Sequence, residues 1–242
     1  MNENLTELVV VIDRSGSMEP VANDAIGGFN TFLKAQKEAP GEAKITVVQF
    51  NTQLEFYAAN VDVKSVQPLD TKTYTPEGGT ALYDAVGLAI DETGKRLASM
   101  KENDRPSKVI FAILTDGEEN SSKKYRGNEI KKMIEHQRDV YKWDFVFLAA
   151  GEGAFKEAEH IGMQMSKTMK FANSGANQAA SYDKLAFYAS NSRSMKSADY
   201  EKFSASVNLQ SVMSDVLDHK VTASTKVAVP TESDEQDAQN KP

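Results

Sequence analysis

The stretch LVVVIDRSGSMEP, residues 8–20, joins a strand to a group of oxygen-bearing side chains. Leu8–Ile12 is an apolar, β-branched run of strand length, and it stops abruptly at Asp13. Ser15 and Ser17 follow at alternate positions, so an extended backbone directs all three polar side chains to one side. Because Asp, Ser and Gly are also common turn residues, this stretch alone is more typical of a plain turn. Only matching polar residues elsewhere in the chain would indicate a functional site.

A second apolar run ends in the same kind of side chain. Val109–Leu114 is followed by the tripeptide TDG, with Asp116 at its centre. Between the two runs, the stretch EGGTALYDA places Thr80 at the expected start of a helix, where threonine is a favourable N-cap. The carboxyl ends of parallel strands meet at one edge of a sheet, so the polar side chains after both runs are expected to converge there.

Strand-like and helix-like segments alternate along most of the chain. The stretches 43–51 and 53–59 predict a hairpin, and the alternation elsewhere predicts right-handed crossovers between parallel strands. The fold class is therefore α/β, with a doubly wound, mostly parallel sheet and one antiparallel edge strand. Further strands are predicted at 109–114, 144–151 and 167–172, and helices at 19–39, 80–100, 127–143, 154–162, 176–195 and 200–220.

The polar side chains at the strand ends form a candidate metal site. Oxygen ligands without histidine or cysteine favour Mg²⁺, or else Mn²⁺ or Ca²⁺. Two aspartates only balance the charge of such an ion, which leaves it short of ligands and able to accept a carboxylate from a protein partner. The predicted metal ligands are Asp13, Ser15, Ser17, Thr80 and Asp116.

These residues resemble the von Willebrand factor A (VWA) family, whose metal-ion-dependent adhesion site (MIDAS) combines Asp-x-Ser-x-Ser with a distant Thr and a distant Asp. DRSGSM, GGTALYDA and ILTDGEEN match these three elements in order. The resemblance implies a Rossmann-like VWA fold and a metal-dependent protein-binding module rather than an enzyme. It also implies that the serines and the threonine bind the metal directly, that the aspartates often act through water, and that an Asp or Glu of the partner completes the site.

Two other functions stay open. A strand that ends in aspartate is also typical of Mg²⁺-dependent phosphohydrolases with an aspartyl nucleophile, but enzymes of the haloacid dehalogenase type would need a second aspartate where this chain has Ser15. No histidine lies in a strand-end loop, so no Ser-His-Asp set is indicated either. The remaining alternative is a structural protein with an unused metal site.

The composition excludes several classes of partner. The 242 residues carry 28 Lys and Arg against 35 Asp and Glu, a net charge of −7 without a basic stripe, so nucleic acid is not an expected partner. The absence of cysteine excludes disulfides and thiolate zinc sites. No segment approaches the roughly 20 apolar residues of a membrane helix, and no signal peptide is recognised, so a cytoplasmic protein without membrane association is predicted.

The chain is predicted to have three parts. A VWA domain is expected over residues 5–172, followed by a helical C-terminal extension over 173–220. Residues 221–242 have few apolar side chains and many charges, which predicts a disordered acidic tail.

Overall fold

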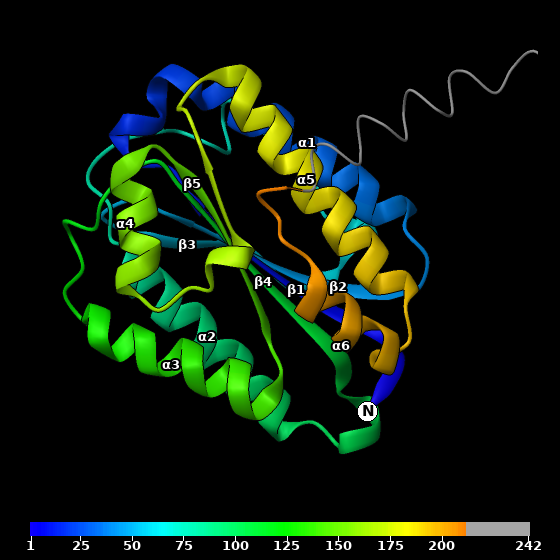
Figure 1. Cartoon of the computed structure of the whole chain (residues 1–242). Coiled ribbons are helices and arrows are strands. Elements are labelled where there is room, and N and C mark those ends of the chain that lie inside the picture. The colour runs from blue at the N-terminus through cyan, green and yellow to red at the C-terminus, as the bar shows by residue number, and fades with distance from the viewer. Residues whose placement is uncertain (212–242) are drawn as a thin grey trace, which may run out of the picture. The chain divides into compact units, whose positions relative to one another are not determined.

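One sheet organises the molecule. The computed structural model describes residues 1–211 (Figure 1), in which six strands follow the order β3-β2-β1-β4-β5-β6. β2 and β3 are antiparallel, and the other neighbouring pairs are parallel. The predicted fold class, with one antiparallel edge strand, is therefore confirmed. The strands are β1 (Asn2–Asp13), β2 (Glu42–Phe50), β3 (Leu54–Asp62), β4 (Pro106–Thr115), β5 (Asp144–Ala150) and β6 (Thr168–Phe171).

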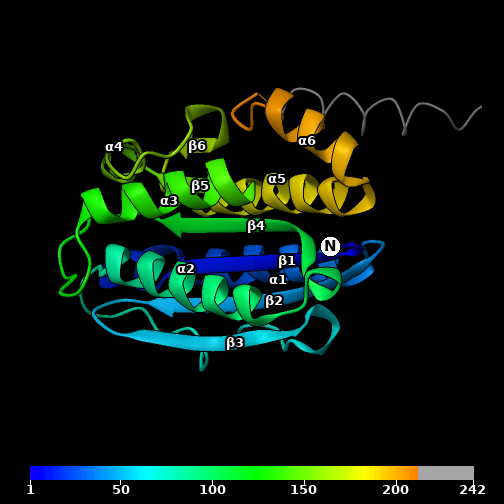
Figure 2. The same cartoon turned by 90° about the horizontal axis from the view of Figure 1, so that it is seen from below.

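Helices cover both faces of the sheet (Figure 2). The helices are α1 (Ala22–Glu38), α2 (Leu82–Ser99), α3 (Gly127–Tyr141), α4 (Glu152–His160), α5 (Gly175–Ser194) and α6 (Ser197–Ser206). Side chains of α2, α3 and α4 share one core cluster with the sheet, whereas α1 and α5 pack together on the opposite face. This two-sided cover is what the alternation of strands and helices predicts. Within residues 1–211, no helix is both long and apolar enough to cross a membrane.

The apolar run of β1 is explained by its place in the middle of the sheet, between β2 and β4. Each residue of the stretch 8–12 is at most 1% exposed. Val9 and Val11 belong to the core cluster with α2 and α3. Because successive side chains of a strand point to opposite faces, the remaining three lie beneath the helices of the other face. A strand that is covered on both faces has a continuous run of apolar residues, and this is why β1 could be predicted from the sequence.

The C-terminal helices pack on the rest of the described chain. α5 lies along α1, where the ring of Tyr182, 1% exposed, covers Gly28. Of the helix predicted over 200–220, the structure has α6, which ends at Ser206; residues 207–211 are not helical, and the predicted part over 212–220 lies outside the described residues. The described part ends at residue 211, so the predicted tail over 221–242 lies outside it. Met1–Gln210 form one compact unit, and the boundary predicted at residue 172 stays a prediction.

Glu7 of β1 places a carboxyl group inside the core. It is 1% exposed, and Nη2 of Arg96 from α2 lies 2.7 Å from its Oε1. Burial raises the pKa of Glu7 from 4.5 to about 7, although Arg96 opposes the shift. The folded chain therefore keeps a proton in this pH range that the unfolded chain releases. Ionisation of Glu7 consequently disfavours the folded state.

We expect the stability of the protein to fall as the pH rises from about 4.5 to about 7, by on the order of 3 kcal/mol from this group. Below about pH 4.5 the contribution of Glu7 to the stability of the folded state is fully present, and above about pH 7 it is lost. Urea unfolding at about pH 5 and about pH 8 measures it, and Glu7→Gln should remove this component of the pH dependence. Glu55→Gln, which alters a 58% exposed carboxylate, should retain it. The same pH dependence in the wild type and in Glu7→Gln would contradict this account.

Candidate metal centre

The loop after β1 holds the first three predicted ligands. Asp13 is fully buried at 0% exposure, and its Oδ1 accepts the backbone N–H of Ser15 at 2.7 Å. The Oγ atoms of Ser15 and Ser17 share a hydrogen bond of 3.0 Å. The N–H of Gly16 donates to the carbonyl oxygen of Gly78 at 3.0 Å, which ties this loop to the segment before α2. The hydroxyls of Ser15 and Ser17 therefore meet, although Ser17 lies in the 3-10 helix Gly16–Val21 and not on the extended backbone that the sequence predicted.

Asp116 joins the loop after β4 to the loop after β1. Its Oδ1 accepts the hydroxyl of Ser17 at 2.7 Å, although the two residues are 99 positions apart in the sequence. Its Oδ2 accepts an N–H of the Asn173 side chain at 3.0 Å, from the segment between β6 and α5. One carboxylate is thus held from two sides at the carboxyl edge of the sheet.

Thr80 borders the same space. It is 3% exposed. A Cβ built on Gly117 would lie 3.5 Å from Thr80 Oγ1 and 3.8 Å from Ser17 Oγ, so both hydroxyls flank the same position. The N–H of Thr80 donates to Asn120 Oδ1 at 2.8 Å, while its hydroxyl makes no hydrogen bond within residues 1–211. The structure therefore places a hydroxyl without a hydrogen-bond partner among the described residues beside the other candidate ligands.

The start of α2 corrects one expectation. The helix begins at Leu82 with Ala81 at the N-cap position, so Thr80 is not the cap. The first N–H groups of α2 bond instead to side chains of the loop 119–122. The expectation was wrong because a segment distant in sequence supplies the capping groups. As a result, the hydroxyl of Thr80 is free to face the strand ends.

Two buried hydroxyls hold Asp13 in place. Thr115 Oγ1 donates to Asp13 Oδ2 at 2.5 Å, and the hydroxyl of Tyr74 donates to the Asp13 carbonyl oxygen at 2.5 Å. Burial raises the pKa of Asp13 to about 6, although the hydrogen bonds from Thr115 and Ser15 favour the charged form and Asp116 disfavours it. The charged form of such a buried carboxylate would be stabilised by a nearby positive charge, which a bound cation would supply.

Sequence reasoning missed four residues that support these side chains. Thr115 precedes Asp116 directly, so the TDG tripeptide contained a signal for it. Tyr74, Asn120 and Asn173 lie in irregular segments, where no periodicity marks a residue that contacts the site. Their contacts arise only from the way in which the loops pack.

The donor chemistry fits a hard divalent cation. The gathered groups are hydroxyl and carboxylate oxygens, without nitrogen or sulfur. Within residues 1–211, no three His, Cys, Asp or Glu side chains come together as a metal site. This agrees with a site in which two carboxylates are supplemented by three hydroxyls.

Fold and site together define an α/β domain with a polar centre at the carboxyl edge of its sheet. The family model for the von Willebrand factor type A domain matches residues 7–184, and the chain belongs to this family. Domains of this family are protein-interaction modules, often metal-dependent and generally without enzymatic activity.

Solved structures share the fold at low sequence identity. Proximal thread matrix protein 1 from the mussel byssus superposes with a TM-score of 0.57 at 15% identity, over 75% of this chain and 47% of that one. Another structure of that mussel protein, at a TM-score of 0.56 and 15% identity over the same shares, has a zinc-occupied MIDAS motif. A von Willebrand factor type A protein from Catenulispora acidiphila has a TM-score of 0.52 at 15% identity, over 76% and 42% of the two chains.

These likenesses concern the fold alone. This chain spans less than half the length of each of those proteins. No curated protein matches the sequence.

Proposed function

We propose that this protein is a metal-dependent protein-binding module whose MIDAS consists of Asp13, Ser15, Ser17, Thr80 and Asp116. The observation that carries the proposal is the hydrogen bond of 2.7 Å between Ser17 and Asp116, because it brings two of the three motif loops into contact. The hydroxyl of Thr80 has no hydrogen-bond partner within the described residues and flanks the same position as Ser17 Oγ, which supports the inclusion of the third loop.

The charges of the proposed site favour an acidic partner. Asp13 and Asp116 supply two negative charges, which only balance those of a divalent cation. Mg²⁺ prefers six oxygen ligands, so water or a partner side chain would have to complete the shell. An Asp or Glu of a protein partner would gain a charge-assisted contact there, whereas a neutral side chain would gain much less. Mn²⁺ and Ca²⁺ suit the same oxygen donors, and the zinc in the mussel protein shows that another ion can occupy such a motif there.

Binding accounts for the residues at the site better than catalysis does. The position that would carry the acid/base aspartate of a phosphohydrolase is Ser15, whose hydroxyl is bonded to that of Ser17. The side chains that hold Asp13 and Asp116 are hydroxyl and amide groups rather than general acids or bases. The proposal therefore assigns no chemical step to the protein. A cytoplasmic location stays a prediction from the sequence.

Metal binding tests the site directly. We expect isothermal titration of Mg²⁺ into chelator-treated protein to give a saturable signal, and Asp116→Ala to weaken the affinity by about 100-fold or more, because it removes a charged group from the site. Glu118→Ala is the matched control, since this carboxylate is in the same loop but packs against Gly153 of α4. Equal Mg²⁺ affinity in the wild type and in Asp116→Ala would refute the assignment.

The role of the metal in partner binding needs a second experiment. A pull-down with the full chain should retain a protein in Mg²⁺ and lose it in chelator, and Asp116→Ala should lose it under both conditions. Replacement of the acidic contact residues of that partner by their amides should have the same effect as chelation. A partner that binds equally well in chelator would not use this site.

A further inference from the structure

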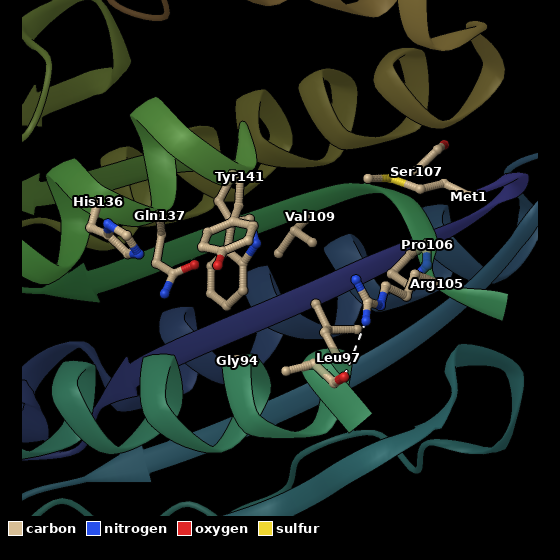
Figure 3. Close-up of a pocket in the computed structure, with 12 residues that line it drawn as sticks. Met1, Gly94, Leu97, Arg105, Pro106, Ser107, Val109, His136, Gln137 and Tyr141 are labelled. Carbon is tan, nitrogen blue, oxygen red and sulfur yellow. Dashed lines mark hydrogen bonds between the residues drawn. The ribbon is translucent and has the colours of Figure 1, made fainter. Parts of the chain in front are cut away.

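A pocket lies at the end of the sheet opposite the candidate metal centre (Figure 3). It has a volume of about 380 Å³ and lies between α2 and α3, over the beginning of β4. The ten residues of β4 run from Pro106 at the pocket to Thr115 beside Asp116, so about 30 Å of strand separates the two regions. The pocket is therefore not part of the proposed MIDAS.

The inner surface of the pocket is apolar. Val109 and Trp143 are each 5% exposed and Leu97 is 9% exposed, and all three line it. On the α2 side, Gly94 and Ala98 leave room between the two helices because their side chains are small or absent. A pocket of this size and lining accommodates a small one- or two-ring molecule.

Two polar residues lie at the β4 end of the pocket. Arg105 donates from Nε to the carbonyl oxygen of Met100 at 3.0 Å and from Nη2 to that of Ala98 at 3.1 Å, which holds the guanidinium in one orientation. Its Nη1 makes no hydrogen bond within the described residues. Ser107 lines the same pocket, and its buried Oγ has no partner in residues 1–211.

The charge of the lining is one-sided. No Asp or Glu lines the pocket, whereas the cationic Arg105 does, in a chain whose net charge is −7. Two further pockets among the described residues differ in this respect, because Glu92 and Arg96 line one of them, and Asp144 and Lys142 line the other. An anion is consequently favoured here over a cation.

We propose that this pocket binds a small aromatic carboxylate, with the carboxylate at Arg105 and the ring against Trp143 between α2 and α3. Arg105, Ser107 and Val109 all line the pocket, and Figure 3 shows that the guanidinium of Arg105 lies toward Leu97 whereas the Ser107 hydroxyl points away from Leu97. The guanidinium supplies charge-assisted hydrogen bonds, and its fixed orientation lowers the entropic cost of binding. The site is independent of the metal centre and of its function.

Trp143 provides the readout, because it is the only tryptophan of the chain. Phenylacetate titrated into the full-length protein should produce a saturable change in tryptophan fluorescence. Phenylacetamide and phenethylamine, which keep the ring but are neutral and cationic, should each bind at least about tenfold more weakly. Absence of a saturable change with phenylacetate, or equal binding of all three compounds, would overturn the proposal.

Two variants, with one control variant, test whether the lining residues bind phenylacetate. Arg105→Gln should weaken phenylacetate binding by about tenfold or more. Lys95→Gln removes a 71% exposed charge of α2 outside the pocket and should leave binding unchanged. Gly94→Leu should fill the pocket and abolish binding without loss of the fold, because the nearest atom to a Cβ at this position is Gln137 Nε2 at 3.8 Å. Circular dichroism and retained Mg²⁺ binding check the fold, and unchanged phenylacetate binding in folded Gly94→Leu would refute the site.

Discussion

Asp144→Ala is expected to destabilise the folded domain by about 3–5 kcal/mol, which is enough to unfold a marginal protein. Asp144 begins β5, and its Oδ2 accepts the hydroxyls of Tyr200 at 2.9 Å and Ser204 at 2.8 Å, and that of Tyr188. The ammonium group of Lys167, 3% exposed, lies 3.4 Å from the same carboxylate. The substitution would therefore leave a buried cation without its counter-charge and three hydroxyls without their acceptor.

Urea unfolding monitored by circular dichroism measures this effect. Asp139→Ala is the control, since it removes a carboxylate that is 62% exposed and paired with Arg138 at the surface, and it should change the unfolding midpoint little. Asp144→Asn should be less harmful than Asp144→Ala, because the amide oxygen can still accept hydrogen bonds. If Asp144→Ala and Asp139→Ala unfolded at the same urea concentration, the hydrogen bonds that Asp144 accepts would not hold α5 and α6 to the sheet.

Two adjacent glycines of α1 are expected to respond with opposite signs to the same substitution. A Cβ on Gly28 would lie only 2.2 Å from Cδ2 of the buried Tyr182 ring, so Gly28→Ala should force α1 and α5 apart and cost about 1–3 kcal/mol. A Cβ on Gly27 would meet no atom within 4 Å, so Gly27→Ala should stabilise the helix by up to about 1 kcal/mol.

Thermal and urea unfolding of the two variants give this comparison. A double-mutant cycle with Tyr182→Leu should show that Gly28→Ala is less harmful once the ring is gone. Equal effects of alanine at the two glycines would mean that the contact between α1 and α5 does not control the stability of the domain.

The sheet could be predicted because its central strands are buried on both faces. Leu8–Ile12 and Val109–Leu114 are continuous apolar runs for this reason, and their neighbours in sequence form crossover helices. The edge hairpin was also recognisable, since β2 and β3 are adjacent in sequence. The end of α6 was not, because the apolar positions that suggested a helix up to residue 220 do not specify where it stops.

The motif indicated which polar side chains gather at the strand ends, but it did not indicate the residues that support them. Asp13, Ser15 and Ser17 lie close together in the sequence, and the turn into the 3-10 helix Gly16–Val21 brings their polar groups together. Tyr74 and Asn173 have no such relation to the loops that they contact. The helix start at Thr80 was misjudged for the same reason, since the loop 119–122 caps α2 from a distance.

By itself, the sequence determined the order of strands and helices, the parallel sheet and the edge at which the polar loops meet. These properties follow from the period of apolar residues and from the rule that parallel strands end on the same side. Only the tertiary structure decided which groups share a site: that Ser17 donates to Asp116, that Asp144 accepts hydrogen bonds from hydroxyls of α5 and α6, and that Arg105 lines an apolar pocket whose lining contains no Asp or Glu. Such contacts depend on how side chains from distant segments pack in three dimensions, and that packing is set by the whole core rather than by any local pattern.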